Sequence, residues 1–248
     1  MSLEQEIHEL AGRRSVLVAT DFDGVVAPLV ETPDLAIPDE RAVALLTELS
    51  RRKDVGVAVI SGRDRADLAL RLGTVPGAIL IGEHGNDSGQ PAGESRVLDD
   101  ARELVGSLQA TMPLAIVEEK PRSVTFHTRR LDRGDSLAAR RALESWVDGR
   151  TGIVLLEGKE VFELTVATRT KGDAVLEMAE PFDVIVYFGD DVTDESVFEV
   201  LEPGDIGIKV GPGATVARHR VDDVDAVVGV LERIIEAVDR RSKGSTNE

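Results

Sequence analysis

Two aspartates stand two residues apart directly after a short apolar run. The stretch "ATDFDGVVAPLV" places Asp21 and Asp23 just beyond residues 16–18. Side chains at positions i and i+2 of an extended segment point the same way. One carboxylate of such a pair can attack phosphorus, while the other protonates the leaving oxygen and later takes a proton from water. An isolated pair is also typical of turns and helix caps, so its interpretation depends on partners elsewhere.

Candidate partners follow other apolar segments or begin a helix. These are Ser61 in "ISGR", Glu83 and His84 in "GEHG", Lys171 in "TKGDAV", and Asp190, Asp191 and Asp194 in "GDDVTDE". In an open parallel sheet, the carboxyl ends of the strands meet at one edge, where ligands bind. We therefore expect these side chains to gather around one site.

The residue types at this edge favour phosphoryl transfer assisted by Mg²⁺. Asp21 and Asp190 supply the hard oxygen ligands that Mg²⁺ prefers, and Asp23 is expected to add its backbone carbonyl. Ser61 and Lys171 are suited to hold the equatorial phosphate oxygens.

The remaining residues at this edge have supporting roles. We expect Asp191 and Asp194 to lie outside the metal ligands. Gly24 permits a tight turn and close approach of phosphate, and Arg63 of "ISGR" and His84 are further candidates for substrate contact.

Alternating apolar runs and helical patterns predict the element that positions these residues. Expected strands cover 15–20, 55–61, 78–82, 182–189 and 206–211, and expected helices cover 39–52, 64–72, 172–180, 194–202 and 224–238. Continuous apolar runs joined by helices indicate a parallel sheet covered on both faces. The segment "KVGPGATVARHR" is expected to be a turn serving this core.

The pattern changes between the expected strand at 78–82 and the expected helix at 172–180. Helices are expected at 98–112 and 135–148, each followed by two closely spaced strands, at 114–120 with 123–130 and at 152–158 with 161–166. Such short connections allow hairpins but no helical crossover. The predicted fold is α/β, with a Rossmann-like core of residues 1–87 and 167–248. An α+β cap domain of order α-β-β-α-β-β, residues 88–166, is inserted into it and can form a lid.

Composition restricts the possible partners. The chain has 248 residues, a formal net charge of −17 and no cysteine, and its hydrophobic and charged fractions of 42% and 30% are those of a globular protein. The acidic balance argues against nucleic acid as a partner. No stretch predicts a membrane span or a secretory signal. We expect a cytoplasmic monomer that acts on a small molecule.

Four of these motifs together resemble a known superfamily. "DFDGVVAPL", "SGR", "TKGDAV" and "GDDVTDE" occur in the order and spacing of the haloacid-dehalogenase-like phosphatases. The resemblance implies an aspartyl-phosphate intermediate formed on Asp21, with Asp23 as general acid and base and Mg²⁺ as cofactor.

A narrower resemblance is to the trehalose-6-phosphate phosphatases. It rests on "APLV", "SGRDRADL", "GEHG", "EEK" followed by "HTR", "EGKEVFEL" and "GIKVGPGATVARHRVDD". By position it implicates Glu118, Lys120, Arg129, Lys159 and Glu163 in binding the sugar, together with His84. The family commonly has an Arg-Pro pair after the last of these glutamates, whereas Leu164 and Thr165 follow Glu163 here.

Two alternatives remain open at this stage. The same chemistry could act on another phosphosugar, of the sucrose phosphate or glycosyl-phosphoglycerate type, and the missing Arg-Pro pair favours this. A phospho-acceptor signalling module also surrounds Mg²⁺ with aspartates, a hydroxyl and a lysine. Asp23 as a proton donor and the large insert argue against the signalling module.

Overall fold

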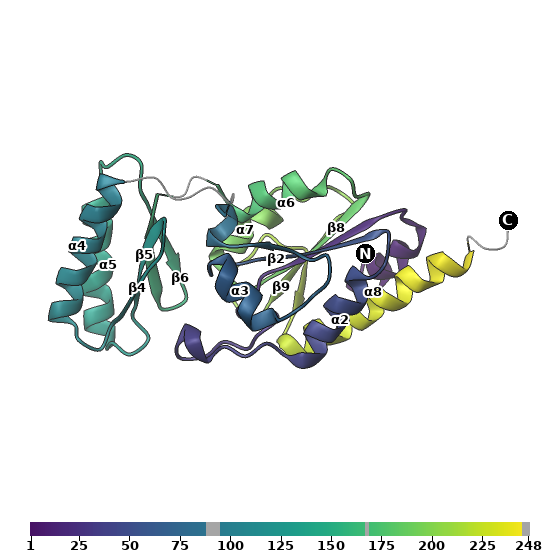
Figure 1. Cartoon of the computed structure of the whole chain (residues 1–248), viewed down its shortest axis with the longest axis horizontal. Helices are drawn as coiled ribbons and strands as arrows, with labels where there is room; N and C mark the ends of the chain where they lie inside the picture. Colours follow the sequence, from purple (N-terminus) through teal and green to yellow (C-terminus); the bar gives the residue numbers. More distant parts are fainter. Residues whose placement is uncertain (88–94, 167–168, 245–248) are drawn as a thin grey trace. The chain divides into compact units, whose positions relative to one another are not determined.

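The computed structural model describes residues 1–87, 95–166 and 169–244 and divides into two compact units. Within the described residues, the core unit consists of 1–87, 169–190 and 194–244, and the cap unit of 95–166 and 191–193 (Figure 1). The domain boundaries predicted at 88 and 167 lie outside the described residues. Among the described residues, none of the helices combines the length and apolar character needed to cross a membrane.

A parallel sheet forms the centre of the core unit, as predicted. Its strands are β1 (Val16–Thr20), β2 (Val55–Ile60), β3 (Ile79–Ile81), β8 (Val184–Gly189), β9 (Ile206–Val210) and β10 (His219–Val221), in the order β10-β9-β8-β1-β2-β3. β1 pairs with both β2 and β8, and Thr20 lies opposite Val59 and Phe188. Because strand order reverses at β1, the segment after Thr20 lies at the switch point where such sheets bind ligands.

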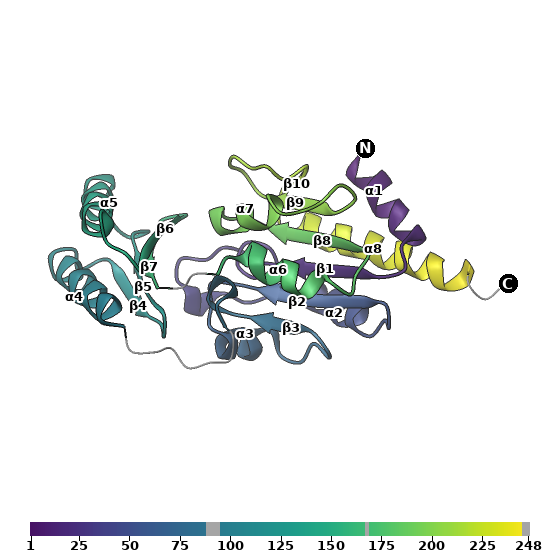
Figure 2. The same cartoon turned by 90° about the horizontal axis from the view of Figure 1, so that it is seen from above.

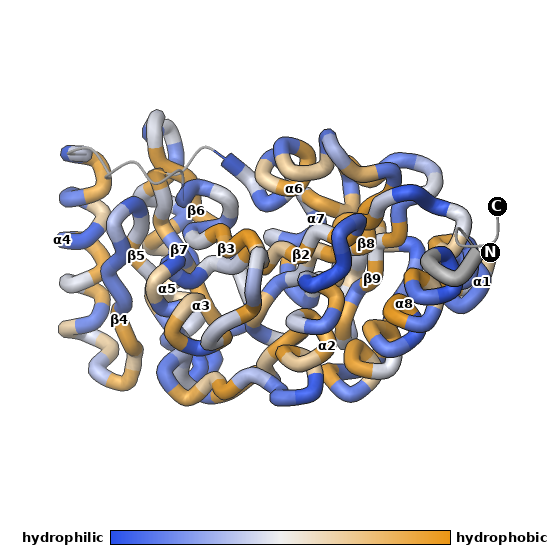
Figure 3. The backbone as a smooth tube through the Cα atoms, turned by 45° about the vertical axis from the view of Figure 1, so that its right-hand side comes forward, coloured by the Kyte–Doolittle hydropathy of each residue, from blue (hydrophilic) through white to orange (hydrophobic). Residues whose placement is uncertain are grey.

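Helices cover both faces of this sheet, which explains its uninterrupted apolar strands. The helices are α1 (Leu3–Glu9), α2 (Glu40–Ser50), α3 (Arg65–Leu72), α6 (Lys171–Ala179), α7 (Val192–Phe198) and α8 (Val224–Gly244). Val16 and Val18 pack with α2 and α8 on one face, whereas Leu17 and Ala19 pack with α6 and α7 on the other (Figure 2). In Figure 3, hydrophobic and hydrophilic residues alternate along α8, as expected for a helix with one buried side.

Two short elements differ from the sequence prediction. α1 forms because Ser2 and Gln5 make a capping box and Ile7 is buried against the core. The segment expected to be only a turn after β9 contains β10, whose residues His219 and Val221 pair with Ile208 and Val210. A three-residue edge strand has too few residues for its periodicity to be recognised.

The two core segments next to the cap insertion are tied to each other by one side chain. Asn86 Nδ2 donates to the backbone oxygen of Arg169 at 2.7 Å, and the backbone N–H of Arg169 donates to Asn86 Oδ1 at 2.9 Å. Asn86 Nδ2 also donates to the oxygen of Glu83 at 2.9 Å. This amide therefore joins residues 83 positions apart in the sequence.

The cap unit contains the predicted antiparallel sheet, and its helices lie on one face of that sheet. Its strands are β4 (Ile116–Glu119), β5 (Ser123–His127), β6 (Val154–Gly158) and β7 (Val161–Thr165), in the order β4-β5-β7-β6, and its helices are α4 (Arg96–Thr111) and α5 (Arg133–Val147). Phe126 and Leu164 pack against the helices through Val105 and Leu143. The register places Glu118, Thr125 and Glu163 side by side on the opposite face.

Candidate active site

Lys171 lies between two buried carboxylates of the core unit. Its Nζ is 2.6 Å from Asp21 Oδ2 and 2.7 Å from Asp194 Oδ1. Asp21 directly follows β1, Lys171 begins α6, and Asp194 lies in the first turn of α7. Residues separated by about 150 positions thus meet at one edge of the sheet, as the strand-end argument predicted.

Burial governs the electrostatics of this group. Burial raises the pKa of the Asp21 carboxyl to about 7, although the charge of Lys171 acts to lower it. Burial alone would lower the pKa of Lys171, but the charges of Asp194 and Asp21 outweigh it and raise that pKa well above its usual value. The lysine therefore remains charged at neutral pH, held between the carboxyl groups of Asp21 and Asp194.

Three carboxylates of this group could together hold a divalent cation. Oxygens of Asp21, Asp190 and Asp194 all lie within 4.8 Å of one another. Asp194 is already engaged, because its Oδ1 accepts from Lys171 and from Tyr187 Oη at 2.6 Å and its Oδ2 accepts from the N–H of Asp190 at 2.8 Å. Hard carboxylate oxygens fit Mg²⁺. Asp194 is the member that orients its neighbours.

Gly24 leaves the space in which the Asp190 side chain lies. Its φ is +78°, and an added Cβ would be 2.2 Å from Asp190 Oδ2. The backbone N–H of Gly24 donates to the oxygen of Ala27 at 2.7 Å and closes the turn after Asp23. Only glycine combines this conformation with the close approach of a carboxylate.

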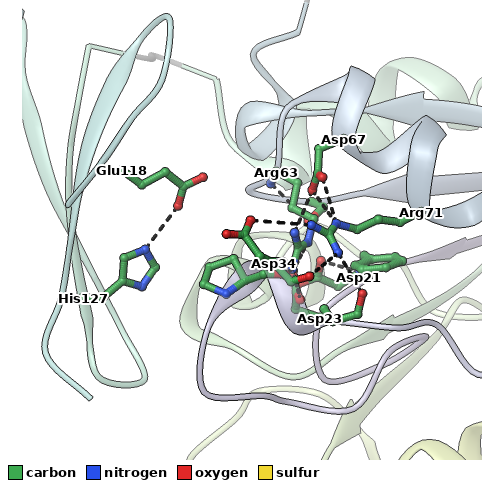
Figure 4. A network of polar contacts seen from close by, with 12 residues as sticks. Asp21, Asp23, Asp34, Arg63, Asp67, Arg71, Glu118 and His127 are labelled. Carbon is green, nitrogen blue, oxygen red and sulfur yellow. Dashed lines mark hydrogen bonds and ion pairs between the residues drawn. The ribbon is translucent and has the colours of Figure 1, made fainter. Parts of the chain in front are cut away.

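Asp23 is held by an arginine rather than by the lysine. Arg63 Nε and Nη2 each donate to one carboxylate oxygen of Asp23 at 2.7 Å, a two-point pair that Figure 4 shows. The side chain of Asp23 is 34% exposed and that of Arg63 only 8%. Two parallel hydrogen bonds fix the direction of the Asp23 carboxylate as well as its position.

Ser61 and His84 belong to two loops that pack closely together. Ser61 is buried, its Oγ accepts from the N–H of Arg63 at 3.3 Å, and its backbone oxygen accepts from the N–H of His84 at 3.0 Å. A Cβ on Gly62 would lie 2.4 Å from His84 Cε1. Glu83 and His84 have φ values of 50° and 54°. This strained backbone is typical of functional loops.

Sequence reasoning missed several residues at this edge. Lys209 of β9 is only 3% exposed and its Nζ donates to the backbone oxygen of Asp190. Tyr187 and Asp67 were also overlooked. The available signals were a lysine inside the apolar run "IGIKVG", the sole tyrosine of the chain in "VIVYFG", and the spacing of four between Arg63 and Asp67. Asp191 accepts from the N–H of Val192 at 2.7 Å, at the start of α7.

The predicted sugar-binding residues of the cap unit fall into two groups. Glu118 Oε2 is 3.2 Å from His127 Nε2, and Lys120 Nζ is 3.6 Å from Glu163 Oε2, all on the face of the cap sheet away from its helices (Figure 4 shows the first pair). Burial raises the pKa of Glu118, but the His127 hydrogen bond and the Lys120 charge outweigh it and lower that pKa. These side chains form one polar cluster.

The second group lies in turns of the cap unit. Arg129 follows β5, and its Nε donates to Glu160 Oε2 at 2.8 Å. Lys159 and Glu160 form the turn between β6 and β7, where both are exposed. The cap unit therefore brings Glu118, Lys120 and Glu163 together and leaves Arg129 and Lys159 at the ends of its strands.

Comparison with known proteins gives a consistent match. The family described as trehalose-phosphatase matches residues 19–225. The chain is 31% identical to a bifunctional trehalose-6-phosphate synthase/phosphatase of Thermoproteus tenax, covering 94% of this chain and 34% of that protein. It is 33% identical to a trehalose-phosphate phosphatase of Mycobacterium avium, covering 93% of this chain and 64% of that protein. The chain thus spans between a third and two thirds of the length of these relatives.

Solved structures agree on the fold. The C-terminal domain of the Candida albicans trehalose-6-phosphate phosphatase has a TM-score of 0.85 at 22% identity, covering 95% of this chain and 97% of that one. A haloacid dehalogenase-like hydrolase from B. subtilis has a TM-score of 0.61 at 14% identity, covering 87% and 98%. The parallel core with its inserted cap is therefore the haloacid-dehalogenase-like fold. With its family match across the four core motifs, the chain belongs to the trehalose-phosphatase family.

Proposed function

We propose that this chain is a Mg²⁺-dependent phosphatase that hydrolyses trehalose 6-phosphate to trehalose and phosphate. The observation that carries the proposal is the group formed by Asp21, Lys171 and Asp194, with Asp190 alongside, at the carboxyl edge of the sheet. Membership of the trehalose-phosphatase family supports the choice of substrate. The printed names of the relatives from T. tenax and M. avium agree with it.

In the first step, Asp21 acts as the nucleophile. One of its carboxylate oxygens forms a bond to phosphorus while the bond from phosphorus to the sugar oxygen breaks. The sugar oxygen keeps the electron pair and takes a proton from Asp23. The product on the protein is an aspartyl phosphate, which divides a difficult hydrolysis into two easier reactions.

In the second step, Asp23 changes from acid to base. Its carboxylate takes a proton from a water molecule as that oxygen attacks phosphorus, and the bond to Asp21 breaks. The two-point hydrogen bond from Arg63, at 2.7 Å for each oxygen, suits Asp23 in its carboxylate form. Phosphate is released and Asp21 is restored.

Other core residues are proposed to hold the phosphoryl group and the metal ion. Asp21 and Asp190 would hold Mg²⁺ through carboxylates and Asp23 through its backbone oxygen, with Asp191 and Asp194 outside them. A bound Mg²⁺ ion would offset the charge of the phosphate and of these carboxylates. Lys171 supplies a buried positive charge for the equatorial oxygens and Ser61 a hydroxyl group.

The cap unit and two residues of the core unit are proposed to select the sugar. Glu118, Lys120 and Glu163 form a polar cluster on one sheet face, with carboxylate acceptors and an ammonium donor suited to hydroxyl groups. Arg129, Lys159, His84 and Arg63 are further proposed contacts, with Gly24 leaving room for the phosphate. Thr165 stands near the position of the family's Arg-Pro pair, so a different phosphosugar is the second candidate substrate.

The test is phosphate release from a panel of sugar phosphates, with and without Mg²⁺. We expect trehalose 6-phosphate to be the preferred substrate, with activity lost after chelation. A tenfold or greater preference for another sugar phosphate would contradict the proposed substrate but not the proposed phosphatase reaction. The variant Asp21→Asn should fold normally and release no phosphate, and near-normal turnover by that variant would refute the nucleophile.

A further inference from the structure

Asp67, on the first turn of α3, holds two arginines at once. Its Oδ2 accepts from Arg63 Nη1 at 2.7 Å, and both its oxygens accept from Arg71 Nε at 2.8 Å. The backbone N–H of Asp67 donates to Asp64 Oδ1, the helix cap, at 2.8 Å. The side chains of Arg63 and Arg71 are 8% and 15% exposed. Asp67 is therefore fixed both by its helix and by two largely buried cations.

Arg63 connects Asp67 to Asp23. One part of its guanidinium, Nη1, faces Asp67, while Nε and Nη2 face the two oxygens of Asp23 (Figure 4). Nη2 also donates to the backbone oxygen of Pro33 at 2.9 Å, and the guanidinium carbon lies 5.2 Å from the centre of the Phe22 ring. Because a guanidinium group is planar and rigid, fixing one edge fixes the direction of the other.

Arg71 anchors the same network to the neighbouring loop. Its Nη1 donates to the backbone oxygen of Ala36 at 2.8 Å. Burial raises the pKa of Asp67, but the hydrogen bonds from Arg71 and Arg63 outweigh it and lower that pKa. Asp67 is thus a carboxylate at neutral pH, and its charge offsets the positive charges of Arg63 and Arg71.

We propose that Asp67 is a positioning residue for Asp23. By holding Arg63, Asp67 sets the direction in which the Asp23 carboxyl faces the leaving oxygen. The proposal rests on the phosphatase activity proposed above. When Asp21 bonds to phosphorus and the phosphorus–oxygen bond breaks, a sugar oxygen needs the proton of Asp23. A p-nitrophenyl oxygen leaves as a stable anion and does not. A misdirected Asp23 therefore slows departure of the sugar and spares departure of the phenol.

The experiment measures the first step alone, by release of the alcohol in a single turnover with enzyme in excess and Mg²⁺ present. For Asp67→Asn we expect trehalose release from trehalose 6-phosphate to slow about tenfold to hundredfold, the scale of a misplaced acid. Release of p-nitrophenol from p-nitrophenyl phosphate should stay within about threefold of the wild type, since that step needs no acid. Asp67→Glu keeps the charge and should recover most of the lost rate.

The matched control is Asp239→Asn. Asp239 also accepts two hydrogen bonds from one arginine, Arg52, at 2.9 and 3.1 Å, but lies on α8. This variant should change neither rate. If Asp67→Asn leaves Arg71 unbalanced and the protein unfolds, the double variant Asp67→Asn, Arg71→Gln removes the extra charge and serves in its place.

Equal slowing of both substrates, or no slowing of either, would overturn the role of Asp67. A crystal structure of Asp67→Asn gives a readout independent of activity: we expect Arg63 to shift and the Asp23 carboxylate to rotate, and an unchanged Asp23 contradicts the proposal. If the wild type releases a different sugar faster, only the proposed substrate fails and that sugar phosphate replaces it. If the wild type has no phosphatase activity, the proposed function fails and the crystal structure alone decides on positioning.

Discussion

The absence of a side chain at Gly24 creates the position that the carboxylate of Asp190 occupies. A methyl group there would lie 2.2 Å from Asp190 Oδ2, and the φ of +78° disfavours any other residue. The DxDG motif therefore contributes to the site in two ways: it supplies two carboxyl groups, and its glycine leaves the space for Asp190. A glycine that follows an acid pair can be as specific a requirement as the acids themselves.

Gly24→Ala should lower the activity far more than it lowers the stability of the protein. We expect activity to fall at least about a hundredfold, since a displacement of about 1 Å at a reacting centre has that effect. The free energy of unfolding should fall by only about 1 kcal/mol or somewhat more, the scale of backbone strain at a positive φ. The control is Gly12→Ala, where the new methyl group meets no atom within 4 Å. Full activity in Gly24→Ala would contradict the close contact.

Added Mg²⁺ should stabilise the wild type against heat. Binding to the folded state alone raises the free energy of unfolding by about 2.7 kcal/mol at a hundredfold excess over Kd. Asp190→Asn, which removes a charged ligand from the group of three carboxylates, should lose most of this gain. The measurement is the Tm with Mg²⁺ and with chelator. An equal Mg²⁺-dependent rise in both proteins would exclude Asp190 as a ligand.

Lys209→Met tests the buried lysine behind Asp190. The substitution removes the donor to the Asp190 backbone oxygen while keeping most of the side-chain volume. An unsatisfied buried acceptor costs about 1–3 kcal/mol of unfolding free energy, and the loop carrying Asp190 should bind Mg²⁺ more weakly. Titration with Mg²⁺ and thermal unfolding measure the two effects. Lys53→Met, at an exposed position, is the control and should change neither.

The Glu118 carboxyl should report on the polar cluster of the cap. Its pKa is lowered, so the stability it contributes is present above its ordinary pKa and is lost as pH falls through the lowered value. His127→Leu removes the hydrogen bond to Glu118, and the pKa of Glu118 should move up. Carboxyl NMR titration measures that pKa, with His8→Leu, at an exposed position of α1, as the control. A pKa of Glu118 that does not move would show that His127 has no part in it.

The convergence of the core site residues could be predicted from the sequence because the carboxyl ends of the strands in a parallel sheet lie at one edge. Asp21 and Lys171 are far apart in the chain, but each adjoins an apolar run or a helix start, and the structure brings them to 2.6 Å. Their catalytic roles stay predictions. The fold class was also predictable, because continuous apolar runs that alternate with helical patterns indicate a parallel sheet covered on both faces.

Other features depend on contacts that sequence patterns do not encode. The sequence places Arg63 just before the helix that carries Asp67, but it does not show that the guanidinium of Arg63 contacts both Asp67 and Asp23. Two hairpins were evident in the insert, but not which edges would pair, and the observed order joins β5 to β7. α1 and β10 were missed because short elements are set by the surface against which they pack.

The hydrogen bonds between Asn86 and Arg169 have a consequence for how this fold can vary. Two hydrogen bonds within the core unit, of 2.7 and 2.9 Å, join the segments on either side of the cap insertion. The insert therefore does not have to supply that closure. We expect that inserts of different size can be accommodated between these two residues, so that the proposed chemistry of the core can be kept while the substrate changes.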